Sequence, residues 1–278
     1  MLTQTEIKVL CAERDIIPQK GKGQNFLIDK NIVKKIISSA DIDPMDIVLE
    51  VGPGLGVLTG ELVKVMGRLV AVELDQKIAL FLQQEYQSFK NMEVISGDIL
   101  KLDIGKIGLI NLNYRLIANL PYNITANFLR LFLAQKIKPK EMILMVQREV
   151  AERIVARPGK MSLLSVMVQF YSQPKVLFKV SRNSFWPRPK VDSAVIRLDI
   201  KAKLPMADEE LFFKVVKTGY SQKRKQLKNN LKGFFGLDIA EISQILADLG
   251  INDKIRAQDL SVEEWVKLAE HIKTREDV

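Results

Sequence analysis

Ile47-Val48-Leu49-Glu50-Val51-Gly52-Pro53-Gly54-Leu55-Gly56, residues 47–56, is the stretch that decides the fold of this chain. The almost uninterrupted apolar run 47–51 predicts a strand buried on both faces of a parallel sheet. The glycines that follow let the backbone turn sharply and come close to a ligand. This order of strand, glycine-rich loop and helix is typical of α/β domains that bind nucleotides. The loop alone does not identify the ligand, because NAD-dependent enzymes have a related one.

Short apolar runs separated by helical patterns continue to about residue 200, which is typical of an α/β domain on a mainly parallel sheet. We predict seven strands, at residues 47–51, 69–73, 93–96, 116–118, 141–146, 176–180 and 194–200. Helices are predicted between them at residues 58–65, 76–86, 126–133 and 149–156. A long segment with prolines joins the last two strands, so we expect them to form an antiparallel pair at one edge of the sheet.

The pattern changes after residue 200. A linker surrounds Pro205, Asp208 can cap a helix that runs towards Lys217, and residues 239–249 and 262–272 have helical periodicity. We therefore predict two domains, an α/β domain at 1–204 and a small all-helical domain at 205–278.

Composition excludes several classes of protein. With 47% hydrophobic and 27% charged residues, the chain is typical of soluble globular proteins, and it has no apolar run long enough to span a membrane. The only cysteine, Cys11, and the only histidine, His271, cannot form a Cys/His zinc site, and they give little support to thiol or Ser-His catalysis. We expect a cytoplasmic protein without a bound metal.

Positive charge is concentrated in two segments. The chain has 42 Lys and Arg against 33 Asp and Glu, a net charge of +9, which favours a polyanionic partner. Residues 211–237 contain no acidic residue, whereas a solvated helix face usually mixes both signs, so this segment is predicted to bind phosphates. Its basic residues are Lys214, Lys217, Lys223, Arg224, Lys225, Lys228 and Lys232. A second cluster consists of Lys20, Lys22, Lys30, Lys34 and Lys35.

The turn Asn119-Leu120-Pro121-Tyr122 follows the fourth predicted strand and can hold an amine. The Asn119 side-chain oxygen and the Leu120 carbonyl can each accept one amino hydrogen, which directs the nitrogen lone pair away from both. Pro121 stiffens the turn, and Tyr122 can stack on the ring that carries the amine. Taken alone, the same residues also fit an ordinary turn.

Carboxylates at the ends of two further strands complete a nucleoside site beside this turn. Glu73 lies about 20 residues after Gly52, where an acidic side chain can accept both ribose hydroxyls. Asp98 follows the third strand and can accept an adenine amino group. Either carboxylate alone could be solvated, but the carboxyl ends of parallel strands meet at the edge where open α/β sheets bind ligands. An NAD site would leave the turn at Asn119 without a role, so a nucleoside methyl donor, S-adenosylmethionine, is the predicted cofactor.

Together these residues resemble the small-subunit rRNA adenine dimethyltransferases of the KsgA type, which are class I seven-strand Rossmann-like methyltransferases with a helical C-terminal domain. The resemblance covers most of the chain. It is carried by Gly23-Gln24-Asn25-Phe26-Leu27, the glycine loop, the turn at 119–122, Val146-Gln147-Arg148-Glu149-Val150-Ala151, the run 185–194 with Pro189-Lys190-Val191-Asp192-Ser193-Ala194, and the basic helix Arg224-Lys225-Gln226-Leu227-Lys228-Asn229.

The resemblance assigns roles to individual residues. It implies that the cofactor is bound by Asn25, Leu27, Gly52, Gly54, Glu73, Asp98 and Asn119. It implies that the catalytic residues are Asn119, Leu120, Pro121, Tyr122 and Phe185, with Phe185 facing Tyr122 across a flipped base. Together with the basic runs, it predicts RNA binding by Lys20, Lys22, Arg148, Lys223, Arg224, Lys225 and Lys228.

The implied reaction is methyl transfer to N6 of two adjacent adenosines in the hairpin loop near the 3′ end of 16S rRNA, by a monomer that also contributes to maturation of the 30S subunit. Two departures from the family pattern stand out. The family usually has Val-Pro-Pro where this chain has Val180-Ser181-Arg182-Asn183, so the loop before Phe185 is expected to be less rigid. Lys223 replaces an arginine, so a bidentate phosphate contact is expected to become monodentate.

Three alternatives remain. Macrolide-resistance 23S rRNA adenine methyltransferases share the glycine loop but more often have Ile at the position of Leu120. DNA adenine methyltransferases are expected to begin the turn with Asp-Pro-Pro, which this chain lacks. A noncatalytic ribosome assembly or transcription factor on the same fold is a third reading, and the intact Glu73, Asp98, Asn119 and Tyr122 speak against it.

Overall fold

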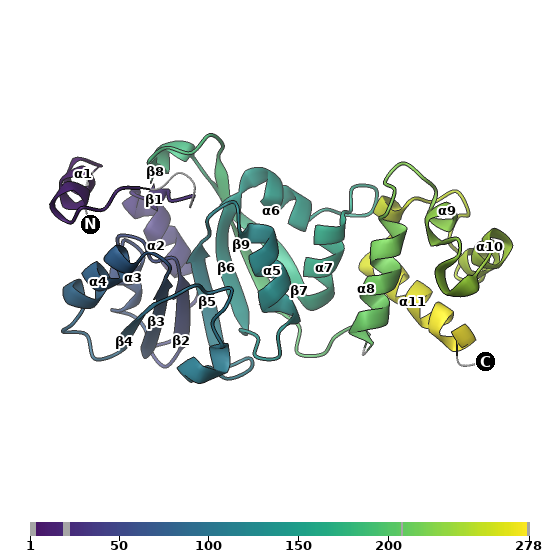
Figure 1. Cartoon of the computed structure of the whole chain (residues 1–278), viewed down its shortest axis with the longest axis horizontal. Coiled ribbons are helices and arrows are strands. Elements are labelled where there is room, and N and C mark those ends of the chain that lie inside the picture. Colours follow the sequence, from purple (N-terminus) through teal and green to yellow (C-terminus); the bar gives the residue numbers. More distant parts are fainter. Residues whose placement is uncertain (1–3, 19–22, 207, 277–278) are drawn as a thin grey trace. The chain divides into compact units, whose positions relative to one another are not determined.

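The computed structural model describes residues 4–18, 23–206 and 208–276, which group into two units (Figure 1). The first unit consists of Met1–Ala151 and Gln173–Ile200, and the second of Glu152–Ser172 and Lys201–Val278. The segment Glu152–Ser172, which the predicted division assigns to the first domain, thus groups with the carboxyl-terminal helices. No helix within the described ranges has both the length and the apolar character that a membrane span requires.

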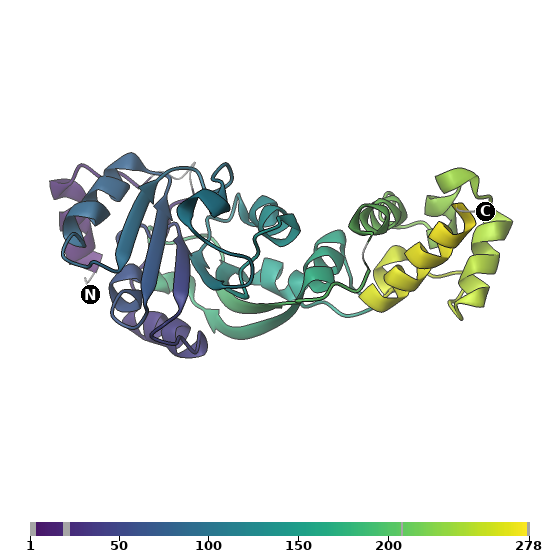
Figure 2. The same ribbon diagram turned by 90° about the horizontal axis from the view of Figure 1, so that it is seen from below.

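The first unit is built around a seven-stranded sheet with the strand order β4-β3-β2-β5-β6-β9-β7, and Figure 2 shows the twist of this sheet. The strands are β2 (Ile47–Val51), β3 (Arg68–Glu73), β4 (Met92–Ser96), β5 (Tyr114–Asn119), β6 (Glu141–Gln147), β7 (Ser172–Val180) and β9 (Ser193–Ile200). Strands β2 to β6 pair in parallel, and β9 runs antiparallel to β6. The predicted α/β class is confirmed, and β7 and β9 are neighbours at one edge of the sheet as predicted.

A second, two-stranded sheet was not predicted. Strand β1 (Phe26–Leu27) pairs antiparallel with β8 (Phe185–Trp186), which follows the short 3-10 helix η3 (Arg182–Ser184). These strands are too short to show an alternating pattern, and their pairing joins segments that lie far apart in the sequence. The amino-terminal segment is thereby held against the late part of the α/β unit.

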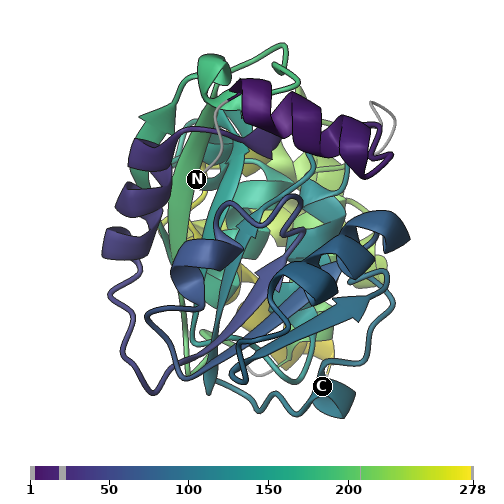
Figure 3. The same cartoon turned by 90° about the vertical axis from the view of Figure 1, so that its left-hand side faces the viewer.

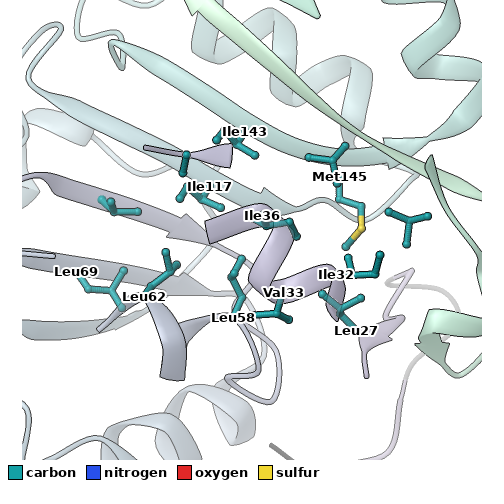
Figure 4. Close-up of a cluster of buried hydrophobic side chains, with 14 of the residues drawn as sticks. Leu27, Ile32, Val33, Ile36, Leu58, Leu62, Leu69, Ile117, Ile143 and Met145 are labelled. Atoms are coloured by element: carbon teal, nitrogen blue, oxygen red, sulfur yellow. The ribbon is translucent and has the colours of Figure 1, made fainter. Parts of the chain in front are cut away.

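One cluster of the hydrophobic core lies between the sheet and helix α2 (Lys30–Ser39), as Figure 4 shows. Asp29 caps this helix by accepting from the backbone N–H groups of Asn31 and Ile32. The helix buries Ile32, Val33 and Ile36. They pack in one cluster with residues from the sheet and from helix α3 (Thr59–Leu62), among them Leu58, Leu62, Leu69, Ile117, Ile143 and Met145.

Helix α1 (Gln4–Glu13) packs on helix α4 (Gln76–Glu85), and both are at the front of Figure 3. Ile7 and Cys11 of α1 lie in one apolar cluster with Ile78 and Leu82 of α4. Burial raises the pKa of the Cys11 thiol, so this cysteine is an apolar packing residue.

The α/β unit also contains helix α5 (Thr125–Ala134) and the 3-10 helix η2 (Ile104–Ile107), and helix α6 (Arg148–Ile154) begins in it. The second unit contains α7 (Leu163–Tyr171), α8 (Glu209–Gly219), α9 (Leu227–Leu231), α10 (Ile239–Asp248) and α11 (Val262–Glu276), with 3-10 helices η4 (Phe234–Gly236) and η5 (Ala257–Asp259). Trp265 is fully buried there. A Cβ at Gly219 would lie 2.4 Å from its ring, so glycine permits the close approach of α8 and α11.

Two differences from the predicted elements have local causes. Helix α7 was not predicted because its nine residues are apolar almost all round, which removes the periodic signal, although Ser162 and Ser165 form a capping box at its start. The predicted helix at 58–65 is shorter, with α3 limited to Thr59–Leu62 and followed by a turn.

Charged side chains form a buried network at the edge of the sheet where β2, β5 and β6 begin. The Arg115 guanidinium contacts Asp46 at 2.7 Å and Glu141 at 2.6 Å, and Arg197 contacts Glu141 at 2.6 Å. Lys140 also pairs with Asp46. The side chains of Asp46, Glu141 and Arg115 are 8%, 4% and 14% exposed, so the charges are stable there only as a set.

Replacing Arg115 with Ala should lower the free energy of unfolding by about 3–5 kcal/mol, because two buried carboxylates lose their shared partner. Urea denaturation followed by circular dichroism measures the change. Lys64→Ala is the matched control, since it removes an exposed pair with Glu61 at 3.0 Å and should cost at most about 1 kcal/mol. Equal effects of the two substitutions would contradict a structural role for the network.

Candidate active site

A cavity of about 910 Å³, including open solvent at its mouth, lies in the α/β unit at the carboxyl ends of β2, β3 and β5. Most of the residues predicted to bind the cofactor or to act in catalysis line it. These are Asn25, Leu27, Gly52, Gly54, Glu73, Asn119, Leu120, Pro121 and Tyr122. The structure therefore brings together the amino-terminal segment, the glycine loop and the amine-holding turn.

The glycine loop has the backbone conformation that glycine favours. Gly52 and Gly54 have φ values of +67° and +56°. The Gly54 N–H donates to the Glu73 Oε2 atom at 3.1 Å. A Cβ at Gly54 would lie 3.0 Å from the Phe26 ring, so the loop and the amino-terminal segment approach each other closely at this point.

Glu73 ends β3 with its carboxylate held by the backbone. Its Oε1 atom accepts the Asp75 N–H at 2.9 Å, and its side chain is buried. Burial raises the pKa of this carboxyl, against the effect of the backbone hydrogen bonds from Asp75 and Gly54. Each oxygen retains a lone pair for a ligand hydroxyl.

Glu50 is a second buried carboxyl in the cavity wall, and no role was predicted for it. Its Oε2 atom accepts the Thr59 hydroxyl at 2.7 Å, and the residue is 1% exposed. Burial, with a smaller contribution from the charge of Glu73, raises the pKa of Glu50 to about 8. The sequence feature that could have indicated a role for Glu50 is that it is the only charged residue in the apolar strand β2.

The amine-holding turn is fixed at each of its residues. The Asn119 Nδ2 atom donates to the Asn25 carbonyl at 3.1 Å, which leaves Oδ1 as the acceptor of that carboxamide. The Leu120 N–H donates to the Met145 carbonyl at 3.2 Å. The Pro121 carbonyl accepts from the Thr125 hydroxyl at 3.2 Å. Side-chain and backbone acceptors are thus held at the end of β5.

The amino-terminal segment lies against this turn. Gly23 has a φ of +66°, and a Cβ there would lie 3.3 Å from the Pro121 side chain and 3.0 Å from Asn123 Oδ1. The Asn25 side chain donates to the Gly23 carbonyl at 3.1 Å. Asn25 therefore contacts Asn119 through its backbone while its own side chain orders the segment.

Tyr122 is half-buried, and its hydroxyl lies 2.7 Å from the Ser193 Oγ atom. Burial raises the pKa of the Tyr122 phenol, and the nearby charge of Asp192 adds to this increase, whereas the Ser193 hydrogen bond opposes it. The phenol is therefore neutral at physiological pH and can donate this hydrogen bond.

Asp98 and Phe185 are not among the residues that line the cavity. Asp98 follows β4 and accepts the Leu100 N–H at 3.0 Å. Phe185 is 3% exposed and packs in the core cluster with Leu27 and Val180. Their roles at the cofactor and at the target base stay predictions.

The loop before Phe185 is held by hydrogen bonds where the family usually has prolines. The Ser181 hydroxyl accepts the Asn183 N–H at 3.2 Å. The Arg182 N–H donates to Asp192 Oδ1 at 3.0 Å, and the Arg182 side chain donates to the Lys190 carbonyl at 3.2 Å. Arg182 therefore connects this loop by hydrogen bonds to Lys190 and Asp192, which lie just before β9.

The basic residues of the carboxyl-terminal domain differ from the prediction in secondary structure and in ion pairing. Lys223, Arg224 and Lys225 are exposed and lie in the turn between α8 and α9, because α9 begins only at Leu227, so the prediction of a basic helix was wrong for these three. Lys228 lies in α9 but is ion-paired with Asp253. Its hydrogen bond is the main cause of the lowered pKa of Asp253.

Two further groups of predicted RNA-binding residues remain. Arg148 is paired with Asp192, with 3.9 Å between its Nη1 atom and Asp192 Oδ2, and its N–H donates to the Asp192 carbonyl at 3.0 Å. Lys20 and Lys22 lie outside the described residues.

Glu50→Gln should make stability less dependent on pH, because Gln keeps an oxygen for Thr59 but does not titrate. The folded-state pKa is raised from 4.5 to about 8, so the stabilisation by this carboxyl is complete below its unfolded pKa and is lost as pH rises to about 8. Between about pH 5 and 8.5 the melting temperature of the variant should fall less than that of the wild type. Thermal denaturation measures both, and Glu61→Gln, at an exposed site, should follow the wild type.

Comparison with known proteins identifies the family. The family model described as ribosomal RNA adenine dimethylase matches residues 19–274. The proteins named ribosomal RNA small subunit methyltransferase A from Dehalococcoides mccartyi and Moorella thermoacetica are similar to this chain. The first is 43% identical over 252 residues, covering 90% of this chain and 87% of the relative. The second is 39% identical over 272 residues, covering 94% of each.

Solved structures agree with the fold. A dimethyladenosine transferase from Plasmodium falciparum has a TM-score of 0.80 at 24% identity, covering 90% of this chain and 98% of that one. The 23S rRNA methyltransferase ErmE has a TM-score of 0.72 at 26% identity, covering 90% of this chain and all of that one. These findings confirm the resemblance, the fold class and the predicted cofactor. The chain therefore belongs to the ribosomal RNA adenine dimethylase family, a family of S-adenosylmethionine-dependent enzymes.

Proposed function

We propose that this protein transfers methyl groups from S-adenosylmethionine to N6 of two adjacent adenosines in the hairpin loop near the 3′ end of 16S rRNA. The observation that carries this proposal is the cavity that joins the Asn119 turn to the glycine loop. The relatives at about 40% identity are named for the small subunit, which supports that subunit as the substrate. The proposal includes action on the immature 30S subunit, as a monomer and in the cytoplasm.

The residues of the cavity fit the cofactor. The positive-φ glycines let the loop backbone itself line the cavity, and the buried Glu73 carboxylate is suited to the two hydroxyls of a ribose. Asn25 and Leu27 would cover the cofactor from the amino-terminal side, and Asp98 would accept its adenine amine. When bound, S-adenosylmethionine supplies an electrophilic methyl group on a sulfonium centre.

The turn makes the adenine amine a better nucleophile. Its lone pair is delocalised into the ring, so the amine must become pyramidal in order to attack. Asn119 Oδ1 and the Leu120 carbonyl accept its two hydrogens and favour that geometry. Because the Asn119 carboxamide is already held by Asn25, it needs little reorganisation during the reaction.

The proton is lost without a dedicated side-chain base. Within the part of the chain that the structure describes, the titratable residues that line the cavity are Glu50, Glu73 and Tyr122. The first is protonated below about pH 8, and the second is held by two backbone N–H groups. The alkylated amine is acidic enough to release its proton to water. Tyr122 instead provides a ring on which the flipped base can stack, with Phe185 as the proposed opposite face.

Four of the seven proposed RNA-binding residues belong to the carboxyl-terminal domain, and for the domains we retain the division into 1–204 and 205–278. Lys223, Arg224 and Lys225 are exposed and close together in one turn, so they can reach phosphates. Lys228 is paired with Asp253 and must exchange that partner before it can bind a phosphate. Lys20, Lys22 and Arg148 complete the proposed RNA-binding set.

Incubation with labelled cofactor and unmethylated small and large ribosomal subunits tests the substrate. Label that maps to two adjacent adenosines of the small-subunit hairpin loop supports the proposal. Label on large-subunit RNA would overturn it in favour of an enzyme that acts on 23S rRNA.

Asn119→Ala should reduce methyl transfer by at least about 10²-fold, because one transition-state hydrogen bond is removed. The affinity for S-adenosylmethionine should stay within about tenfold of the wild type, since the glycine loop and Glu73 are unchanged. Single-turnover transfer and calorimetric cofactor titration measure the two quantities. Near-normal transfer would exclude the proposed role of Asn119.

Neutralising Lys223, Arg224 and Lys225 to Gln should flatten the salt dependence of RNA binding by roughly 0.7–0.9 in log–log slope for each phosphate that is no longer neutralised. The matched control is Lys64, Lys90 and Lys106 changed to Gln, which removes three exposed charges outside the basic segment. RNA affinity measured over a range of salt concentrations gives the slope. A slope that changes equally in both triple variants would show that only net charge matters.

A further inference from the structure

Ser193 is buried behind the amine-holding turn. It is the first residue of β9, it is 0% exposed, and its Oγ atom lies 2.7 Å from the Tyr122 hydroxyl. Its backbone is placed by the antiparallel ladder, in which Ser193 is opposite Gln147 of β6. The hydroxyl is thus a fixed polar point at the end of the tyrosine that lines the cavity.

The residue before Ser193 is held from two other segments. The Asp192 carbonyl accepts the Arg148 N–H at 3.0 Å, and its carboxylate accepts the Arg182 N–H at 3.0 Å. The start of α6 and the loop before Phe185 therefore both hold the chain at the position from which Ser193 projects. The backbone that carries the Ser193 hydroxyl is therefore anchored by hydrogen bonds from both segments.

A hydrogen-bond partner such as the Ser193 hydroxyl can hold the ring of a tyrosine in one orientation. The second side-chain torsion of tyrosine has a broad energy well, so packing alone leaves freedom about the Cβ–Cγ bond. The phenolic oxygen lies on the axis of this rotation, so a hydrogen bond to Ser193 fixes the position of the ring end. Because the phenolic O–H prefers the plane of the ring, the direction of this hydrogen bond also favours one orientation of the ring. A base that stacks on this ring is then oriented relative to the Asn119 and Leu120 acceptors.

We infer that Ser193 is a positioning residue for methyl transfer, which holds the Tyr122 phenol and so fixes the plane on which the target base stacks. This inference rests on the proposed function, in which Tyr122 stacks on the base. It gives the Pro189-Lys190-Val191-Asp192-Ser193-Ala194 run a role at the amine-holding turn, through Tyr122. Alanine would fill the same buried position but would leave the phenol of a half-buried tyrosine without this partner.

Ser193→Ala should lower kcat for transfer by about 10- to 100-fold, as expected when a reacting group is misplaced by about 1 Å, with cofactor affinity within about twofold of the wild type. Tyr122→Phe keeps the ring but removes the hydroxyl, and it should give a similar loss. Because both changes break one hydrogen bond, the double variant should be no slower than the slower single variant. Ser193→Thr retains the hydroxyl on a residue suited to strands and should recover most of the rate.

Ser172→Ala is the matched control. Ser172 is also a buried serine at the start of a strand, but its hydroxyl donates to the Val168 carbonyl at 2.8 Å. Its transfer rate should equal that of the wild type. If Ser193→Ala also transfers at the wild-type rate, or if the two single losses multiply in the double variant, the positioning role is rejected.

A spectroscopic measurement separates this inference from the proposed function. With 3-fluorotyrosine incorporated, the ¹⁹F resonance of Tyr122 is assigned by its absence in Tyr122→Phe. It should shift or broaden in Ser193→Ala and stay in place in Ser172→Ala. An unchanged resonance rejects the role of Ser193 whatever the substrate is, whereas a wild-type protein that does not methylate small-subunit RNA rejects the proposed function alone.

Discussion

The parallel register of β2, β3 and β5 is the constraint on which the site depends. Val51 of β2 is opposite Val72 of β3 and Ala118 of β5. The next residues along the three strands are Gly52, Glu73 and Asn119, so the ladder places the glycine loop, the buried carboxylate and the amine-holding turn side by side. A shift of one residue in either pairing would separate them, since successive side chains point to opposite faces of a sheet.

Around this edge, segments distant in the sequence complete the wall. The β1–β8 pair holds Asn25 and Leu27 over the cavity, and Asn25 in turn orients the Asn119 carboxamide. On the other side, Ser193 holds Tyr122 from the start of β9. The Asn119 carboxamide and the Tyr122 phenol are therefore each held by a hydrogen bond from a distant segment, which is the kind of positioning that electrostatic and orientational catalysis requires.

The charges of the protein serve different purposes in its different parts. Arg115, Asp46 and Glu141 form a buried network in the α/β unit, and Lys228 is ion-paired with Asp253. Lys223, Arg224 and Lys225 project from an exposed turn. A run of lysines and arginines in a sequence therefore overstates the phosphate-binding surface, because some of its members already have partners inside the protein.

The sequence by itself determined the α/β class, the cofactor loop and the residues at the ends of β2, β3 and β5, because these depend on local patterns: an apolar run, glycines where φ is positive, and a polar residue after each strand. Helix α7 was not predicted, because apolar residues lie on almost all of its sides and leave no helical periodicity in the sequence. Only the tertiary structure decided the pairing of β1 with β8, the ion pair of Lys228 and the bond between Tyr122 and Ser193. Each joins residues that are far apart along the chain, and the geometry that makes them partners exists only once the sheet has formed.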